Sequence, residues 1–260
     1  MDLIHGLSGL LVGLLVGMTG VGGGSLMAPI MILLLGVAPT TAVGTDLWFA
    51  AITKIAGSAV HQSLGEPDWQ VVRRLALGSL PASIVTSIML AQMNMSEVKQ
   101  GLIMNALGVL LIVTAIATFS WLRVQRAALS LSPDTAARYK LRQPALTVAA
   151  GALLGVLVTL TSIGAGALGA VLLLALYPLR MSARRLVGTD IVHAVPLTIV
   201  AGLGHLFMGN VDFMLLGSLL VGSIPGIVLG SWLATRLPGG IMRPILAVVL
   251  AAVGFRMLTS

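Results

Sequence analysis

The sequence has 260 residues, of which 57% are hydrophobic and only 9% are charged, and its mean hydropathy is +1.05. Soluble domains carry roughly 25% charged residues, so water cannot be the solvent for most of this surface. The formal net charge of +7 does not indicate nucleic-acid binding, because the basic residues lie in short loops between apolar runs. The composition therefore excludes a soluble protein and predicts that the lipid bilayer covers most of the chain.

A spanning helix needs about 20 apolar residues, so this length allows many crossings but leaves no room for an added soluble domain. We expect one all-α integral membrane domain over residues 1–260, since lipid gives backbone groups no partner outside a helix. The lack of cysteine excludes disulfides, thiolate chemistry and cysteine-bound metals. No metal site and no cofactor are expected.

Ten apolar stretches follow one another along the chain, and each predicts a helical segment. They run over residues 3–19, 25–37, 44–62, 71–92, 98–121, 144–161, 166–179, 186–208, 213–235 and 241–258. The chain therefore has about eight hydrophobic helical segments if the short stretches are joined to their neighbours, and ten if they are separate. Between them, the polar stretch 122–143 holds five basic residues and Ser132-Pro133-Asp134, which predicts a cytoplasmic linker.

The two halves repeat each other at a constant spacing of 144 residues. The repeated blocks are Gly44-Thr45-Asp46 with Gly188-Thr189-Asp190, His61 with His205, Gly65 with Gly209, Asp68 with Asp212, and Gly78-Ser79-Leu80-Pro81 with Gly222-Ser223-Ile224-Pro225. One spacing shared by separated blocks predicts an internal duplication, with repeat one over 3–121 and repeat two over 144–258.

The direction of the second repeat depends on how the stretches 3–37 and 144–179 cross the membrane. If each is a single kinked helix, the two repeats are parallel. If each is a hairpin that enters and leaves by the same side, the repeats are inverted, and twelve Lys and Arg lie on one side against two on the other. The excess of basic residues on cytoplasmic sides favours inverted repeats with both termini outside.

Two glycine runs provide the turns of these hairpins and a candidate anion site. Arms of roughly 17 and 12 residues would bring the glycines to the middle of the bilayer at 1.5 Å per residue. Free amides at a helix N-terminus attract anions, and broken helices of this kind form substrate sites in transporters. The candidate substrate-binding residues are Gly22, Gly23, Gly24 and Ser25 in the first run and Gly164 and Gly166 in the second. The alternative is that these glycines only ease helix packing.

Lys54 lies in the middle of an apolar helix, where an unpaired charge costs at least about 2.5 to 3.5 kcal/mol. It must therefore face a partner, water or substrate. His61 is seven residues further on, and so projects from nearly the same face of the helix. A cationic stripe on a cavity wall would suit an anion. A structural pair between Lys54 and Asp46 or another acid is the alternative.

Asp46 and Asp190 follow Gly-Thr at matching positions, where acids and hydroxyls cap exposed amides at helix starts. Capping is the favoured role of these acids, with Thr45 and Thr189 as further candidates for substrate binding. His193 stands one turn after Asp190, and such a pair could relay protons if these are coupled to transport. A proton or sodium is the possible coupling ion. His61 and His205 either mark the membrane edges or act in gating.

These motifs together resemble the sulfite exporter TauE/SafE family of permeases. The resemblance rests on Gly-x-Gly-Gly-Gly at 20–24, Pro29, Gly44-Thr45-Asp46 with its later copy, and the segment 162–169, and it extends from Gly6 to Arg256. It implies transport of sulfite or related sulfonate anions across a bacterial inner membrane. The second glycine run lacks the triple glycine of the first, which argues against two equivalent anion sites.

We therefore expect a secondary transporter that moves a small anion by alternating access. An anion channel shares the same site chemistry, but mirrored halves around one site suit alternating access better. An intramembrane enzyme would need a nucleophile such as Ser25 with His193 or His205 as base. The sequence contains no Gly-x-Ser-x-Gly or His-Glu-x-x-His pattern to support one.

Overall fold

The computed structural model describes residues 3–19, 26–60, 67–93, 96–120, 133–164, 166–178, 180–234 and 239–259. These residues form helices joined by short connections, and no strand occurs among them. The helices are α1 (Leu3–Thr19), α2 (Met27–Leu33), α3 (Pro39–Val60), α4 (Trp69–Gln92), α5 (Ser96–Phe119), α7 (Pro133–Thr161), α8 (Ala167–Leu176), α9 (Ala183–Phe207), α10 (Phe213–Ala234) and α11 (Gly239–Leu258). The expected all-α fold is confirmed.

The surface and the interior have the polarity of a protein dissolved in lipid. Large apolar side chains face outward, such as Leu77 and Met214, which are 69% and 77% exposed. Polar side chains face inward, and Asp46, Thr198 and His205 are fully buried. In water this arrangement would cost free energy on both counts, whereas a bilayer leaves only the interior to be satisfied by hydrogen bonds.

Five of the described helices are long and apolar enough to cross a membrane. They include Trp69–Gln92, Gln100–Phe119, Lys140–Thr161, Arg185–Phe207 and Phe213–Gly230. In contrast, α2 has 7 residues and α8 has 10, which at 1.5 Å per residue is too short for a crossing. The described part of the chain therefore combines helices long enough to span a bilayer with helices that are too short to do so.

The helical conformation is interrupted between α7 and α8, at the second glycine run. Ser162 and Gly164 adopt positive φ angles of 59° and 124°. Left-handed backbone cannot continue a helix, and a serine adopts it only at a cost. The Gly164 carbonyl then accepts bonds from the amides of Gly166 and Gly169, both at 2.9 Å, which starts α8. The first glycine run, at 20–24, lies outside the described residues, between the end of α1 and the start of α2.

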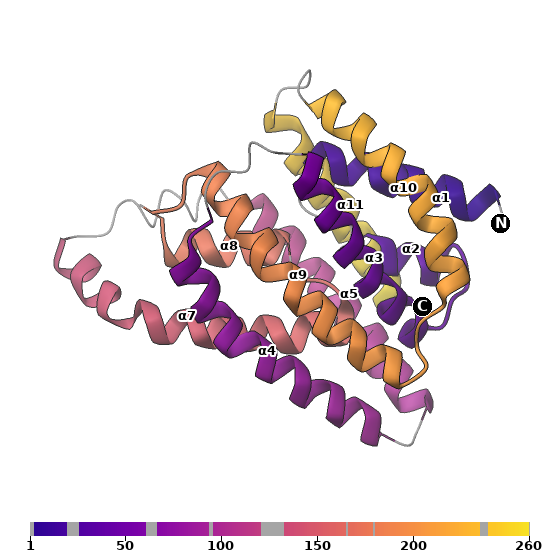
Figure 1. Ribbon diagram of the computed structural model, residues 1–260, viewed down its shortest axis with the longest axis horizontal. Helices are drawn as coiled ribbons and strands as arrows, with labels where there is room; N and C mark the ends of the chain where they lie inside the picture. Colours follow the sequence, from indigo (N-terminus) through magenta and orange to yellow (C-terminus); the bar gives the residue numbers. More distant parts are fainter. Residues whose placement is uncertain are drawn as a thin grey trace.

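Helices distant in sequence cross at glycines. α4 packs against α7, and α1 against α10 (Figure 1). A Cβ atom on Gly78 would overlap the Val148 carbonyl, and one on Gly151 would overlap the Leu75 carbonyl, so the backbones of α4 and α7 touch directly. Such contact replaces side-chain packing in membrane bundles.

The same contacts recur in the crossing of α1 with α10. Gly222, 144 residues after Gly78, lies against the Gly6 carbonyl. Gly9, 142 residues before Gly151, lies against the Leu219 carbonyl. The two crossings thus use residues that the sequence spacing pairs with one another.

The structure corrects two boundaries. Residues 133–143, expected within the polar linker, form the first turns of α7. Pro144 lies inside this helix without ending it. The helices that carry Asp46 and Asp190 begin at Pro39 and Ala183, earlier than their apolar stretches suggest. Both acids therefore lie about two turns inside their helices.

Candidate substrate site

Lys54 on α3 forms an ion pair with Asp190 on α9. The Lys54 Nζ lies 3.5 Å from the Asp190 Oδ2, and the two side chains are 5% and 10% exposed. A lysine held in the middle of a spanning helix keeps its charge only beside such a partner. Of the two interpretations of Lys54, pairing with an acid other than Asp46 is what the geometry shows, and this pair is the centre of the candidate site.

Asp190 also joins the pair to the start of α8. Its Oδ1 lies so close to Gly169 that a Cβ there would approach it to 2.6 Å. Gly166 precedes α8 without a side-chain hydrogen bond to cap the helix. The first amides of α8 therefore lie near a buried ion pair, at the end of the helix where anions are favoured. Gly169 therefore lies between the Gly164 carbonyl and the Asp190 carboxylate, which brings the second glycine run next to the ion pair.

His193 and Ser79 complete this cluster. The His193 Nε2 lies 2.9 Å from the Ser79 hydroxyl, and both side chains are buried. Lys54 is near enough for its charge to act on the His193 ring. We call Lys54, Asp190, His193 and Ser79 the central cluster; its members come from α3, α9 and α4. Ser79 was not a candidate from sequence, although its place in the repeated Gly-Ser block marked the segment.

Asp46 lies apart from any cation. Its side chain is fully buried and faces the Ser162 hydroxyl and the backbone amide of Ala28. Neither group meets the carboxylate at hydrogen-bond geometry, and in the described part of the chain both carboxylate oxygens and the Ser162 hydroxyl lack a partner. The two acids of the Gly-Thr-Asp motifs therefore have different surroundings.

The expectation that Asp46 and Asp190 cap helices is wrong. Ser182 is the N-cap of α9, where its hydroxyl accepts from the Arg185 amide at 3.3 Å. Asp68 and Asp212, which the sequence identified only as a repeated pair, are the capping acids. Asp68 accepts from the Val71 amide at the start of α4, and Asp212 from the Leu215 amide at the start of α10.

Thr45 and Thr189 bind the backbone of these capping residues. The Thr189 hydroxyl accepts from the Asp68 amide at 2.9 Å, and the Thr45 hydroxyl accepts from the Asp212 amide at 3.0 Å. Each Gly-Thr-Asp motif therefore holds the start of a helix from the other half of the chain, while its aspartate points to the interior. Both threonines therefore have a structural role, which is to fix the starts of α4 and α10.

Of the remaining candidate site residues, His205 lies in the described part of the chain. It lies in the last turn of α9, is fully buried, and its Nε2 lies 2.9 Å from the Thr159 carbonyl. Gly22, Gly23, Gly24, Ser25 and His61 lie outside the described residues. Their roles stay predictions.

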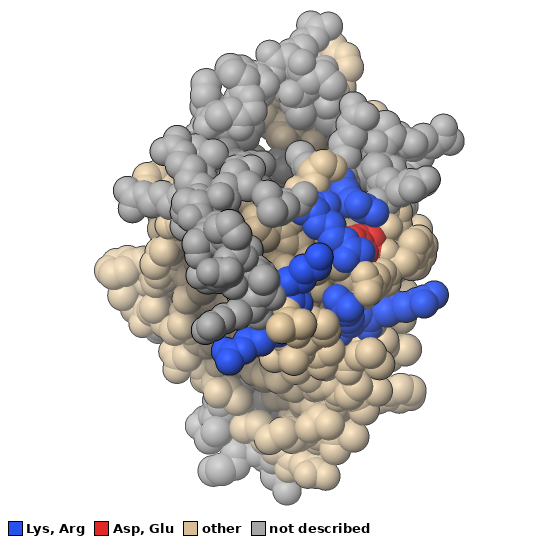
Figure 2. Space-filling model, turned by 90° about the vertical axis from the view of Figure 1, so that its left-hand side faces the viewer, with Lys and Arg blue, Asp and Glu red and all other residues tan. Residues whose placement is uncertain are grey.

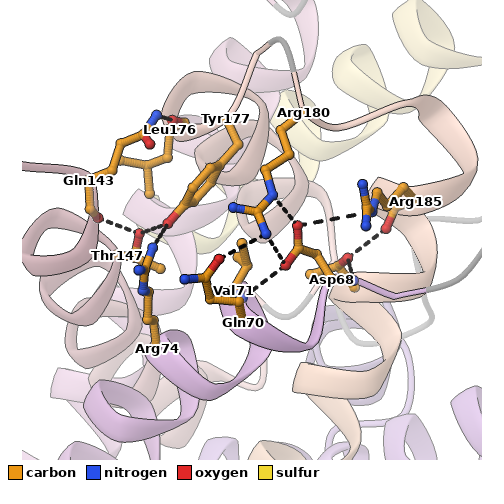
Figure 3. A network of polar contacts seen from close by, with 11 residues as sticks. Asp68, Gln70, Val71, Arg74, Gln143, Thr147, Leu176, Tyr177, Arg180 and Arg185 are labelled. Carbon is orange, nitrogen blue, oxygen red and sulfur yellow. Dashed lines mark hydrogen bonds and ion pairs between the residues drawn. The ribbon is translucent and has the colours of Figure 1, made fainter. Parts of the chain in front are cut away.

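A second polar network joins α4 to the segment between α8 and α9 (Figure 3). Arg180 donates from Nη2 to the Asp68 Oδ1 and to the Gln70 Oε1, both at 2.9 Å, and its Nε contacts the second Asp68 oxygen. The Nε of Arg185 lies 4.0 Å from the same carboxylate. The Asp68 side chain is 2% exposed, whereas the two arginines are 41% and 43% exposed. Asp68 thus ties the start of α4 to the segment between α8 and α9.

The same network continues to α7. Arg74 donates to the Tyr177 hydroxyl at 3.3 Å, which lies 2.6 Å from the Thr147 hydroxyl. Lys and Arg side chains gather on one face of the molecule (Figure 2). Such clustering is what the positive-inside bias predicts for a cytoplasmic face.

We expect Arg180→Gln to lower the thermal midpoint of the detergent-solubilised protein. The change leaves buried Asp68 without its strongest contact, but exposure and salt screening limit the loss to about 1 kcal/mol. The difference from wild type should shrink in high salt, where the pair is weak already. Arg142→Gln is the control, because Arg142 is exposed on the same helix as Thr147. Equal thermal midpoints for the two variants in low salt would show that the ion pair between Arg180 and Asp68 does not stabilise the protein.

The chain was compared with known proteins. Residues 6–257 match the family described as Sulfite exporter TauE/SafE. "Probable membrane transporter protein YjnA" of Bacillus subtilis (strain 168) is 40% identical over 214 residues, which cover 80% of this chain and 81% of that protein. "Probable membrane transporter protein YdhB" of the same organism is 27% identical over 206 residues, 79% of either chain. No solved structure matches the chain.

Family membership follows from coverage as well as identity. The match takes in the helices that carry the central cluster and the segments on both sides of them. Both relatives are aligned over about four fifths of their length and are named as membrane transporters. The chain belongs to the sulfite exporter TauE/SafE family, and it is a multi-pass membrane transporter rather than an enzyme.

Proposed function

We propose that the protein is a secondary transporter that moves sulfite or another small sulfonate-like oxyanion by alternating access. Lys54 is the observation that carries the proposal. A primary ammonium is the costliest kind of group to hold inside a bilayer, and here it is buried at a junction of several helices. Its partner lies 3.5 Å away, at the long limit of a hydrogen bond, and an ammonium has three donors, so it keeps capacity for a second anionic partner.

The start of α8 supplies the second element of the site. Backbone amides at a helix N-terminus bind sulfur and phosphorus oxyanions without a formal charge of their own. In this site they would share the substrate with Lys54, while the small glycines Gly164 and Gly166 let an oxyanion approach the backbone. The first glycine run, Gly22 to Gly24 with Ser25, would contribute from the other half. The family description, which names sulfite, supports this substrate class.

Alternating access needs two halves that can move against each other around the site. We propose that repeat one, 3–121, and repeat two, 144–258, are inverted copies. The reciprocal bonds of Thr45 with Asp212 and Thr189 with Asp68 support a two-fold relation, as do the matched glycine crossings. In such transporters each half presents the same surface to the site, and rocking exposes it to either side.

Proteoliposomes loaded with one anion and diluted into its labelled form test the proposal. We expect sulfite, thiosulfate or sulfoacetate to show saturable uptake and counterflow, whereas zwitterionic taurine should be transported less well. A channel would instead pass ionic current without counterflow. Absence of uptake for every anion of this panel would overturn the proposed substrate class.

A further inference from the structure

The two Gly-Thr-Asp acids occupy equivalent positions but differ in charge compensation. Asp190 is paired with Lys54. The residue 144 positions after Lys54 is Thr198, so the equivalent place beside Asp46 holds no cation. The residue equivalent to His193 is Phe49, which is fully buried. Asp190 therefore has a lysine from the other half and a histidine on its own helix, whereas the equivalent positions around Asp46 hold neutral side chains.

No described group neutralises Asp46. The helices packed against α3 are α2, α5, α9 and α10. The described side chains of α2, α5 and α10 include no titratable group. The other described titratable side chains on α3 and α9 all have contacts elsewhere. Lys54 contacts Asp190, His193 contacts Ser79, His205 contacts the Thr159 carbonyl, and Arg185 contacts Asp68.

A charged carboxylate in this position would be unstable. Removing an ion from water into a low-dielectric interior costs several kcal/mol even after relaxation, and hydrogen bonds or an opposite charge must offset it. Asp46 is fully buried, and both its oxygens lack a partner. A proton removes the charge at once. The protonated acid can then donate to the Ser162 hydroxyl, which it faces and which is itself buried without a partner.

Ser162 is held at a strained position. Its φ of 59° lies in the left-handed region, at the break between α7 and α8. Such strain persists only where the surroundings enforce it, and it is concentrated at functional sites. The break is also where the proposed anion site lies, so a proton on Asp46 would be next to the segment that leads into the anion site.

We propose that Asp46, facing Ser162, is the binding site for a proton that travels with the anion. The inference rests on the proposed function. The Lys54–Asp190 pair is neutral as a whole, so an arriving anion brings an uncompensated negative charge into the bilayer. While the empty site is open to water on one side, the Asp46 carboxylate can ionise. A proton taken up from that side as the anion binds balances the charge of the anion and neutralises the carboxylate before it is buried, and the proton leaves to water on the other side when the anion does.

Asp46→Asn tests this directly, because asparagine resembles the permanently protonated acid. In proteoliposomes the variant should keep anion counterflow, since exchange moves no net proton. Accumulation driven by a pH gradient should fall to the level measured without a gradient. Asp212→Asn is the matched control: asparagine still caps α10, and gradient-driven accumulation should persist. If Asp46→Asn accumulates anion as wild type does, the proposal is wrong while the transport function stands.

Proton uptake on binding gives a second measurement that needs no transport cycle. Adding the anion to weakly buffered wild-type protein in detergent should take up about one proton per bound anion beyond the uptake by Asp46→Asn. The difference between the two proteins removes any titration of the anion itself. Equal proton uptake, or wild-type accumulation driven by sodium at constant pH, would overturn the assignment. Failure of the wild type to bind any panel anion would instead count against the proposed function.

Discussion

Replacing Gly78 with valine is expected to leave little folded protein, because α4 and α7 touch through their backbones at this residue. A Cβ on Gly78 would overlap the Val148 carbonyl and approach the Ala152 amide nitrogen to 2.7 Å. A flexible side chain could move aside, whereas helix backbone moves only if the whole crossing separates. Overpacking typically costs about 1 to 3 kcal/mol, and rigid neighbours place this substitution at the upper end.

The measurement is the yield of monodisperse protein after extraction in detergent, together with its thermal midpoint. Gly217→Val is the matched control, because Gly217 is exposed on α10 and a Cβ there meets nothing within 4 Å. Both variants carry the same change in helix propensity, so their difference isolates the crossing. Gly222→Val should behave like Gly78→Val, since Gly222 lies against the Gly6 carbonyl in the other crossing. Normal yield for Gly78→Val would contradict the close approach of α4 and α7.

The membrane fold was predictable from sequence because hydrophobicity over long stretches is a local property. The helix break after Thr161 was also indicated, since Ser162 to Gly166 contain glycines that leave a helix easily. The start of α3 was missed by five residues. Its first turn, from Pro39, is rich in threonine and so lacks the apolar signal, although proline is well suited to the first position of a helix.

The partners of the buried charges were not predictable. Lys54 had to have a partner, but which of the few acids it meets depends on how α3 packs against α9. The two residues are 136 positions apart, and no local pattern encodes that contact. The contrast between Asp46 and Asp190 was hidden for the same reason. Their sequence contexts are nearly identical, while their spatial neighbours differ.

The repeat spacing carried more structural information than any motif. It paired Thr45 with Thr189 and Asp68 with Asp212, and these four residues form the two reciprocal bonds. The spacing indicated that these residues matter, but the sequence predicted substrate binding for the two threonines and no role for Asp68 and Asp212. Inversion of the repeats stays a prediction, which the reciprocal contacts support.

Lys54→Met should reduce anion transport by about 10- to 100-fold, the loss expected when one charge-assisted contact of about 1.5 to 3 kcal/mol disappears. The single variant also leaves Asp190 buried without its cation. Breaking a buried ion pair in this way costs about 3 to 5 kcal/mol, so lower yield is expected as well. Loss of transport in this variant therefore does not distinguish a substrate contact from a structural one.

The double variant Lys54→Met with Asp190→Asn separates the two roles. It removes both charges, so no unpaired ion remains and the thermal midpoint should recover toward wild type. If Lys54 binds the anion, this well-folded protein still transports about 10- to 100-fold less than wild type in counterflow. If Lys54 serves only to neutralise Asp190, transport returns together with stability. Because Asp190 also contacts the start of α8, the single variant Asp190→Asn must be measured beside the double variant. We expect Asp190→Asn to bind the anion but to release it slowly, since Lys54 then has no competing carboxylate.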